Sequence, residues 1–329
     1  MIEYILFVLG FIFLIKGASF LVDGSSSIAK KLGIAPIVIG LTLVAFGTSF
    51  PELAVNIFSV SQSDQIPIGN IIGSNITNIL LILGLAAFVY PISIPKNTVW
   101  KEIPFSLIAA IALVIVANDF ILSGLPSILS RGDGLLLMIF FVIFLYYISV
   151  LIRTRKLDGV TKFIKGEVSL GKQVQIKTYP NHASFLMIIV GLIGLVIGGK
   201  WVVDGAVFIA NQFGVSQALI SLAVIAVGTS LPELATSIIA MRKRRSEIAI
   251  GNIIGSNIFN IFFVLSISST IRPMNFPQIL NFDILIVVAS TLLLFGFMFI
   301  GRKHTLDRWQ GLAFLLFYAA YILFILYRG

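Results

Sequence analysis

Apolar residues occupy ten long stretches of this chain, and short polar loops separate them. A membrane-spanning α-helix needs about 20 predominantly apolar residues, and a longer stretch can tilt or break within the bilayer. The pattern therefore predicts an all-α polytopic membrane protein with ten transmembrane helices. The predicted spans are residues 3–22, 34–60, 67–90, 103–119, 134–152, 184–210, 216–241, 247–270, 281–300 and 308–327.

Composition agrees with this pattern. Hydrophobic residues make up 58% of the 329 residues and charged residues 11%, whereas soluble domains carry about 25% charged residues. The chain has no cysteine, which excludes disulfides and thiolate metal sites. We expect no cleavable signal peptide at residues 1–21, because no basic segment leads it and Lys16 falls inside the apolar run.

The basic residues predict the orientation of the chain. If the N-terminus lies outside, 18 of the 23 Lys and Arg residues fall in inside loops and three fall in outside loops. Such a bias marks the cytoplasmic side of a membrane protein, so both termini are expected outside. Topology, rather than nucleic-acid binding, therefore explains the net charge of +9. We interpret the most polar segment, residues 153–182, as a basic cytoplasmic linker between residues 1–152 and 183–329.

Two sequence motifs occur once in each of these halves. The first, Gly-Thr-Ser-x-Pro-Glu, occupies residues 47–52 and 228–233. The second, Gly-Asn-Ile-Ile-Gly-Ser-Asn, occupies residues 69–75 and 251–257. Because each half has five predicted spans, the second copy enters the membrane from the opposite side. The halves are therefore predicted to be inverted five-helix repeats, an arrangement found in many secondary transporters.

The first motif places a carboxylate inside an apolar run, at Glu52 and Glu233. A charged residue at that depth costs roughly 2.5–3.5 kcal/mol on insertion scales, so a repeated pair indicates a functional site. The proline before each glutamate removes a helical hydrogen bond. Backbone carbonyls freed by this break, such as those of Ala45 and Ala226, need a partner, and a bound cation would supply it.

Hydroxyl and amide side chains accompany both glutamates. Thr48, for example, lies four residues before Glu52 and therefore on the same helical face. An all-oxygen site suits hard cations, since calcium takes 6–8 oxygen ligands. Two glutamates would neutralise one divalent ion, and several monovalent ions could occupy the same oxygens instead. The candidate metal ligands from this pattern are Glu52, Glu233, Thr48, Thr229, Ser74, Asn78, Ser256, Asn260 and the carbonyls of Ala45 and Ala226.

Other residues of these segments have simpler interpretations. Asn75 and Asn257 are expected to hydrogen-bond between helices, and the glycines of the second motif are expected to permit close helix packing. Asp23 and Asp204 are interpreted as cap or boundary residues. Lys200 precedes Asp204 by four residues, which predicts an ion pair within one helix.

With its paired motifs, the chain resembles the cation/calcium exchanger superfamily, in particular its sodium/calcium antiporters. The α-repeats of that family would correspond to residues 40–84 and 221–266. The resemblance implies that four repeat helices surround a central ion site, across which the first and sixth spans slide as a gate. It implies that Glu52 and Glu233 bind calcium and sodium. The remaining candidate ligands that it implies are Ser49 and Ser230.

One position departs from the family pattern. Well-described sodium/calcium members carry Asn in one repeat and Asp in the other, where this chain has Asn78 and Asn260. The central site is therefore expected to hold two acids rather than three. An amide oxygen remains a cation ligand, so sodium and calcium binding are still expected.

The expected function is sodium-driven calcium antiport by alternating access, with calcium and sodium as transported ions and no cofactor. We expect a prokaryotic plasma-membrane protein in which one chain suffices for transport. A proton-coupled exchanger of the same fold is the main alternative, since a buried glutamate can bind a proton. A passive cation channel could use rings of carboxylates, but the inverted repeat favours alternating access. An enzyme is not expected, because the chain has no H-E-x-x-H motif and no cysteine nucleophile.

Overall fold

Long apolar helices make up most of the described chain. The structure is a computed structural model that describes residues 2–61, 63–119, 124, 127–164, 176–213 and 226–328. In these residues, nine helical segments are long and apolar enough to cross a membrane, which confirms a polytopic membrane protein. The predicted span 216–241 lies partly outside the described residues. Its described part forms α12 (Ala226–Thr229) and α13 (Leu231–Arg242).

Several spans consist of consecutive short elements, because π-helical turns or breaks interrupt them. The helical elements of the first half are α1 (Ile2–Leu32), α2 (Pro36–Ile39), η1 (Gly40–Val44), α3 (Ala45–Thr48), α4 (Phe50–Ser59), α5 (Gln65–Ile76), η2 (Thr77–Leu83), α6 (Gly84–Val89), η3 (Thr98–Glu102), α7 (Ile103–Val116) and α9 (Arg131–Ile164). Those of the second half, besides α12 and α13, are α10 (Asn181–Gln212), α14 (Ser246–Phe259), η5 (Asn260–Leu265), α15 (Ser266–Ile271), η6 (Gln278–Leu280), α16 (Asn281–Phe297) and α17 (Arg308–Arg328).

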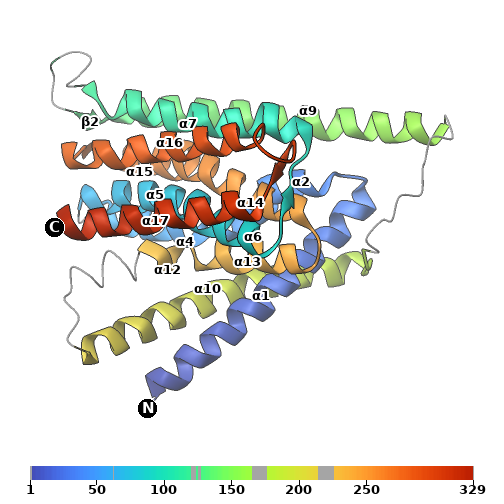
Figure 1. Ribbon diagram of the computed structural model, residues 1–329, viewed down its shortest axis with the longest axis horizontal. Coiled ribbons are helices and arrows are strands. Elements are labelled where there is room, and N and C mark those ends of the chain that lie inside the picture. The colour runs from blue at the N-terminus through green and yellow to red at the C-terminus, as the bar shows by residue number, and fades with distance from the viewer. Residues whose placement is uncertain are drawn as a thin grey trace.

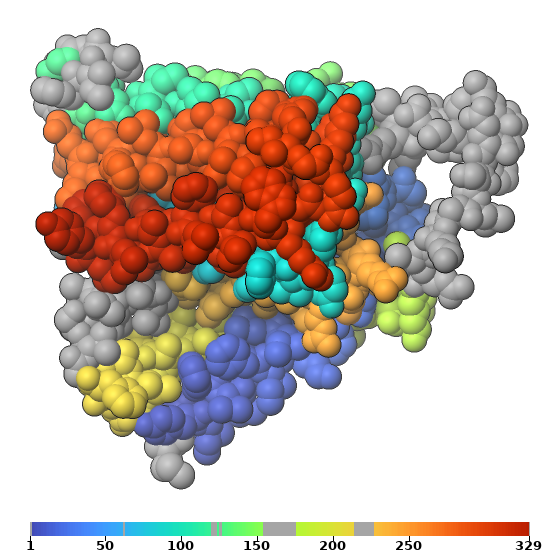
Figure 2. Space-filling view, in the orientation of Figure 1, coloured from blue at the N-terminus to red at the C-terminus, as the bar shows by residue number. Residues whose placement is uncertain are grey.

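The helices form a central group and an outer group. In its most apolar stretch, the span that contains α14 is 94% buried, whereas that of α17 is 22% buried. Figure 1 shows α4, α5, α13 and α14 in the middle of the bundle, α7 and α9 along one side, and α1 and α10 crossing the other side obliquely. In the space-filling view, α16 and α17 cover much of the face toward the viewer, above α1 and α10 (Figure 2). The two motifs therefore lie on the enclosed helices.

The outer helices α1 and α10 pack backbone against backbone. Gly10, Gly17 and Gly24 recur every seven residues along α1 and face α10. A Cβ added at Gly17 would lie 2.8 Å from the Gly191 carbonyl oxygen, and one added at Gly198 would lie 2.7 Å from the Gly10 carbonyl oxygen. Side chains do not fit there, so the glycines allow α1 and α10 to form one closely joined pair.

Glycines of the second motif also bring helices together. A Cβ added at Gly251 would lie 2.7 Å from the Ile37 carbonyl oxygen, and one added at Gly255 would lie 2.7 Å from the Ala45 Cβ. These contacts place α14 directly against the span that contains α2, η1 and α3. For the matching glycines of α5, Gly69 and Gly73, no atom of another described helix lies within 4 Å of such a Cβ. Close packing is thus confirmed for the second copy of the motif only.

Two short strand pairs connect loops of the two halves. β1 (Ile92–Ser93) pairs antiparallel with β4 (Thr305–Leu306), and β2 (Ile128–Leu129) pairs antiparallel with β3 (Met274–Asn275). Hydropathy did not predict these strands, because each has only two residues. Each pair joins a loop of the first half to a loop of the second half, so the halves are connected at two separate places.

The helix α9 extends into the predicted linker between the halves. α9 continues to Ile164, twelve residues beyond the predicted boundary at residue 152, and α10 begins at Asn181. Lys, Arg and Leu in this stretch are good helix formers, so the helix continues after the apolar run ends. Residues 165–175 lie outside the described residues.

Candidate cation site

Both copies of the first motif interrupt a helix at the same residue. Ser49 separates α3 from α4, and Ser230 separates α12 from α13. Their φ and ψ angles are −81° and 5° for Ser49, and −88° and 7° for Ser230. This sparsely populated region of φ/ψ space is where many turn and active-site residues lie. The two halves therefore present breaks of the same backbone shape.

The break does not free the carbonyl of Ala45, which was predicted to be a freed ligand. The Ala45 carbonyl accepts the Ser49 amide at 2.9 Å, and the Thr48 hydroxyl oxygen lies 3.3 Å from it. Pro51 lacks the amide that would reach the carbonyl four residues earlier. The carbonyl that loses its helical donor is therefore that of Gly47, and the prediction for Ala45 was wrong in this respect.

The second break differs in one bond. The Ser230 amide donates to the Val227 carbonyl at 3.1 Å, three residues earlier rather than four. Ala226 begins the short helix α12, directly after residues that lie outside the described ones. Its carbonyl stays a predicted ligand.

Glu52 and Glu233 lie in the first helical turn after each break, and both residues are 1% exposed. Ser49 donates to Glu233 Oε1 at 3.2 Å, which brings the two halves into contact at the carboxylate. Ser74 donates to Glu52 Oε1 at 3.5 Å, and Ser256 donates to Glu233 Oε1 at 3.4 Å. Within the described residues, the other carboxylate oxygen of each glutamate, Oε2, has no hydrogen-bond partner.

Asn78 and Asn260 lie in the π-helical turns η2 and η5 and are at most 1% exposed. Asn78 Nδ2 donates to Asn257 Oδ1 at 2.9 Å, and Asn260 Nδ2 donates to Asn75 Oδ1 at 3.0 Å. The predicted helix-to-helix role of Asn75 and Asn257 is thus confirmed. Among the residues that the structure describes, Oδ1 of Asn78 and Oδ1 of Asn260 have no hydrogen-bond partner.

The motif threonines bond to two asparagines that were not predicted to belong to the site. Thr48 Oγ1 donates to Asn252 Oδ1 at 3.0 Å, and Thr229 Oγ1 donates to Asn70 Oδ1 at 3.3 Å. Both asparagines are the second residue of Gly-Asn-Ile-Ile-Gly-Ser-Asn. Their identical place in the two copies was the signal that could have identified them.

These side chains form an acceptor-rich site with two formal negative charges. A buried acceptor without a partner costs about 1–3 kcal/mol, so four such oxygens in one cluster favour a ligand that attracts lone pairs. In the described part of the chain, no group of three or more His, Cys, Asp or Glu side chains is placed to hold a metal ion. Cation binding would therefore depend on two carboxylates supplemented by amide and hydroxyl oxygens.

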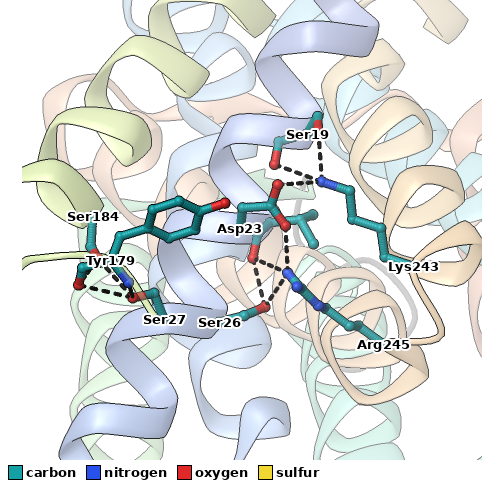
Figure 3. Close-up of polar contacts among 9 residues, drawn as sticks. Ser19, Asp23, Ser26, Ser27, Tyr179, Ser184, Lys243 and Arg245 are labelled. Atoms are coloured by element: carbon teal, nitrogen blue, oxygen red, sulfur yellow. Dashed lines mark hydrogen bonds and ion pairs between the residues drawn. The ribbon is translucent and has the colours of Figure 1, made fainter. Parts of the chain in front are cut away.

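Two aspartates at matching positions outside this site pair differently. Asp23 lies inside α1 rather than at a helix cap, because α1 continues to residue 32. Its carboxylate pairs with Lys243 Nζ at 2.6 Å and with Arg245 Nη1 at 2.9 Å (Figure 3). Asp204 pairs with Lys200 of its own helix at 2.6 Å, as predicted.

Known proteins resemble this chain in both sequence and fold. The family model described as sodium/calcium exchanger protein matches residues 2–150 and 183–327. The chain is 32% identical over 352 residues to the sodium/calcium exchanger MaX1 of Methanosarcina acetivorans, with 99% of each chain covered. It is 37% identical over 273 residues to the inner membrane protein YrbG of Escherichia coli, with 82% of this chain and 79% of that protein covered. A structure of the sodium-calcium exchanger NCX_Mj, soaked with 2.5 mM Na+ and 0.1 mM Sr2+, aligns with a TM-score of 0.80 and 33% identity over 98% of each chain.

Proposed function

Because this chain belongs to the sodium/calcium exchanger protein family, we propose that its central oxygen cluster is where it exchanges sodium for calcium. The protein is a secondary active antiporter rather than an enzyme, and it needs no cofactor. One observation carries the assignment of the site. Within the described residues, Glu52 Oε2, Glu233 Oε2, Asn78 Oδ1 and Asn260 Oδ1 are buried oxygens without a hydrogen-bond partner.

The other proposed ligands come from the same spans as these four oxygens. Hydroxyl groups that already donate to a carboxylate or amide oxygen keep their lone pairs for an ion. The side chains proposed to bind the ions are Glu52, Glu233, Thr48, Ser49, Thr229, Ser230, Ser74, Asn78, Ser256 and Asn260. The carbonyls of Ala45 and Ala226 complete the set, with the Ala45 carbonyl sharing its lone pairs with the Ser49 amide.

Charge balance explains why such a site would exchange ions. The two carboxylates are neutralised by one calcium ion or by two sodium ions, and the same oxygens serve in either case. Occupancy by one ion species therefore excludes the other. A buried site with uncompensated charge is costly. The protein with an empty site would therefore switch access from one membrane face to the other less readily than the protein with a loaded site. That difference couples the two fluxes.

We extend the proposal to the architecture. Residues 1–152 and 183–329 would each supply five spans of an inverted repeat, with residues 153–182 as the linker. Matching breaks at the first motif and matching π-helical turns η2 and η5 support this division. The family model matches two separate segments, residues 2–150 and 183–327, which supports it further.

The charge distribution supports an orientation with both termini outside. The basic loops after α1, α6, α13 and α16 fall on one side in that arrangement. In Figure 1, α1 begins and α17 ends toward the same end of the bundle, as an even number of spans requires. The turn between α13 and α14, which carries Lys243 and Arg245, would then face the cytoplasm.

Radioactive-calcium uptake into sodium-loaded proteoliposomes tests this function. After dilution into sodium-free buffer at fixed pH, the wild type should accumulate calcium, whereas Glu52→Gln should accumulate none above empty liposomes. Glu102→Gln is a matched control, because Glu102 is a buried glutamate that bonds to Tyr147 outside the proposed site. Uptake in Glu52→Gln at the wild-type rate would refute the site. Uptake that requires a pH gradient and no sodium would indicate proton coupling, and downhill flux alone would indicate a channel.

A further inference from the structure

Four asparagines lie directly behind the proposed ligands. Each accepts one hydrogen bond through its Oδ1 atom: Asn70 from Thr229, Asn75 from Asn260, Asn252 from Thr48, and Asn257 from Asn78. We refer to these four residues as the outer asparagines, and they are Asn70, Asn75, Asn252 and Asn257. Three of them are at most 2% exposed, and Asn70 is partly buried.

We propose that the outer asparagines are positioning residues, each of which accepts a hydrogen bond from one of these four ligands and thereby turns an oxygen lone pair of that ligand toward the ion. The proposal rests on the proposed function of the central site and assigns a role to residues that do not bind the ion themselves. An asparagine side chain carries an acceptor at one end and two donors at the other. If the donor end faced the site, it would repel a cation, so the orientation of Asn78 and Asn260 decides whether they can be ligands.

The orientation of Asn260 follows from a backbone carbonyl. Asn75 Nδ2 donates to the carbonyl oxygen of Asn257 at 3.3 Å. A carbonyl oxygen can only accept, so the amino group of Asn75 must point toward it. Asn75 Oδ1 is therefore the atom that faces Asn260, and it can only accept the Asn260 amino group, at 3.0 Å. As a result, Asn260 presents its oxygen to the site.

An equivalent set of hydrogen bonds runs from Asn257 back to Asn75 and fixes Asn78. Asn257 Nδ2 donates to the Asn75 carbonyl oxygen at 3.4 Å, and Asn257 Oδ1 accepts the Asn78 amino group at 2.9 Å. The two outer asparagines thus fix each other through their backbones. Asn78 is left with its oxygen toward the site, which matches its unpartnered Oδ1 atom among the described residues.

The threonines are fixed by an equivalent arrangement. Asn252 Nδ2 donates to the Ser237 hydroxyl at 3.2 Å and to the Glu233 carbonyl at 3.5 Å, so its oxygen must accept from Thr48. Because a hydroxyl has one donor, Thr48 then offers only lone pairs.

Thr229 is fixed through Asn70. Asn70 Nδ2 donates to Asn56 Oδ1 at 2.8 Å, and Asn56 Nδ2 donates to the Pro67 carbonyl at 3.1 Å. This series of bonds also ends on a backbone carbonyl, which can only accept. Asn70 Oδ1 must therefore accept the Thr229 hydroxyl, at 3.3 Å. Thr229 is left with lone pairs for an ion, as Thr48 is.

Calcium titration calorimetry of the purified full-length protein tests the proposal with a double-mutant cycle. Asn257→Leu removes the acceptor that orients Asn78 and should weaken calcium binding on the order of 10–100-fold, the usual effect of losing a residue that orients a metal ligand. In an Asn78→Ala background, the same substitution should cause no further loss, because no amide remains to be oriented. A packing role would instead weaken binding in both backgrounds.

Asn118→Leu is the matched control, since Asn118 is a buried asparagine just after α7 whose Nδ2 atom donates to the Val114 carbonyl, away from the proposed site. It should leave calcium affinity unchanged. Wild-type affinity in a folded Asn257→Leu protein, or additive losses in the double variant, would overturn the proposal. A wild type that binds no calcium, or binds it equally with Glu52→Gln, would refute the proposed function instead.

A calcium-bound structure of the wild type is the second measurement, and it does not depend on any variant folding. The proposal expects one amide atom of Asn78 within about 2.3–2.6 Å of the ion, the distance of a calcium–oxygen bond. The other amide atom of Asn78 should contact Asn257. An Asn78 amide that turns away from the ion while Asn257 keeps its contacts would overturn the proposal.

Discussion

At the scale of single residues, the proposed site depends on two carboxylates and on the neutral oxygens that share the ion with them. The sequence revealed Glu52 and Glu233 because a charge within an apolar run is costly and therefore informative. It did not reveal Asn70 or Asn252, because their hydrogen bonds reach ligands about 160 and 200 residues away in the chain. It also misplaced the freed carbonyl at Ala45, because the amide that Pro51 lacks would bond the carbonyl four residues earlier, at Gly47, while the Ser49 amide bonds Ala45.

Asn260→Asp should make calcium transport depend more steeply on pH. The new carboxylate would stand near Glu52 and Glu233 and opposite Asn75 Oδ1, which now accepts from Asn260 Nδ2 at 3.0 Å. A protonated carboxyl would restore that hydrogen bond and reduce the repulsion among three acids. Protons and calcium would then compete, so uptake should fall as pH decreases.

Initial uptake rates in sodium-loaded proteoliposomes between pH 6 and pH 8 measure this effect. The wild type is the reference, and Asn78→Asp should behave like Asn260→Asp because its amide is held in the same way by Asn257. A pH profile for Asn260→Asp that coincides with the wild type would show that this position does not face the site.

At the scale of helices, the break at the first motif positions both glutamates. Sequence reasoning predicted a break there because proline lacks an amide. It could not predict the π-helical turns that carry Asn78 and Asn260, because no residue type specifies such a turn. π-Helical turns occur frequently at functional sites, and here they occur at matching places in the two halves.

Pro51→Ala should reduce calcium transport without destabilising the protein. Alanine supplies an amide that can donate to the Gly47 carbonyl, and it fits the first turn of α4, where Pro51 lies. The span would tend to become continuous, and Glu52 would rotate relative to Glu233. Thermal unfolding in detergent should therefore occur at the same or a higher temperature, while calcium affinity falls.

Pro67→Ala provides the control for this prediction. Pro67 lies in the first turn of α5, where a missing amide costs little because the first helical amides have no intrahelical partner. Its transport rate should match the wild type. If Pro51→Ala also transports calcium normally, the break is not required for ion binding.

At the scale of the whole molecule, the sequence predicted most of the spans, because hydropathy is a property of long segments. The internal repeat stays a prediction from the duplicated motifs. The sequence did not predict how the halves are joined. The strand pairs β1–β4 and β2–β3 and the glycine contacts between α1 and α10 bring together residues that are far apart in the chain. Such pairings depend on the packed structure rather than on local pattern.

One connection breaks the symmetry between the halves. Asp23 of α1 pairs with Lys243 and Arg245 of the turn between α13 and α14, and the exposed fractions of the three side chains lie between 12% and 26%. Within the described residues, Asp204, the matching residue of α10, forms its ion pair with Lys200 of the same helix, and those side chains are 58% and 70% exposed. A partly buried ion-pair cluster therefore ties α1 to the turn between α13 and α14, whereas the ion pair of Asp204 lies within α10.

Asp23→Asn should shift the protein away from the conformation described here. Charged hydrogen bonds contribute about 1.5–3 kcal/mol each, and each 1.4 kcal/mol corresponds to a tenfold change in an equilibrium constant.

Because the chain has no native cysteine, a single cysteine introduced at the buried Thr236 of α13 can report opening toward that end. In Asp23→Asn it should react with a membrane-impermeant maleimide at least severalfold faster than in the wild-type background. Asp204→Asn, which removes only an exposed pair, should leave the rate unchanged, and equal rates in all three proteins would show that the cluster does not hold this end closed.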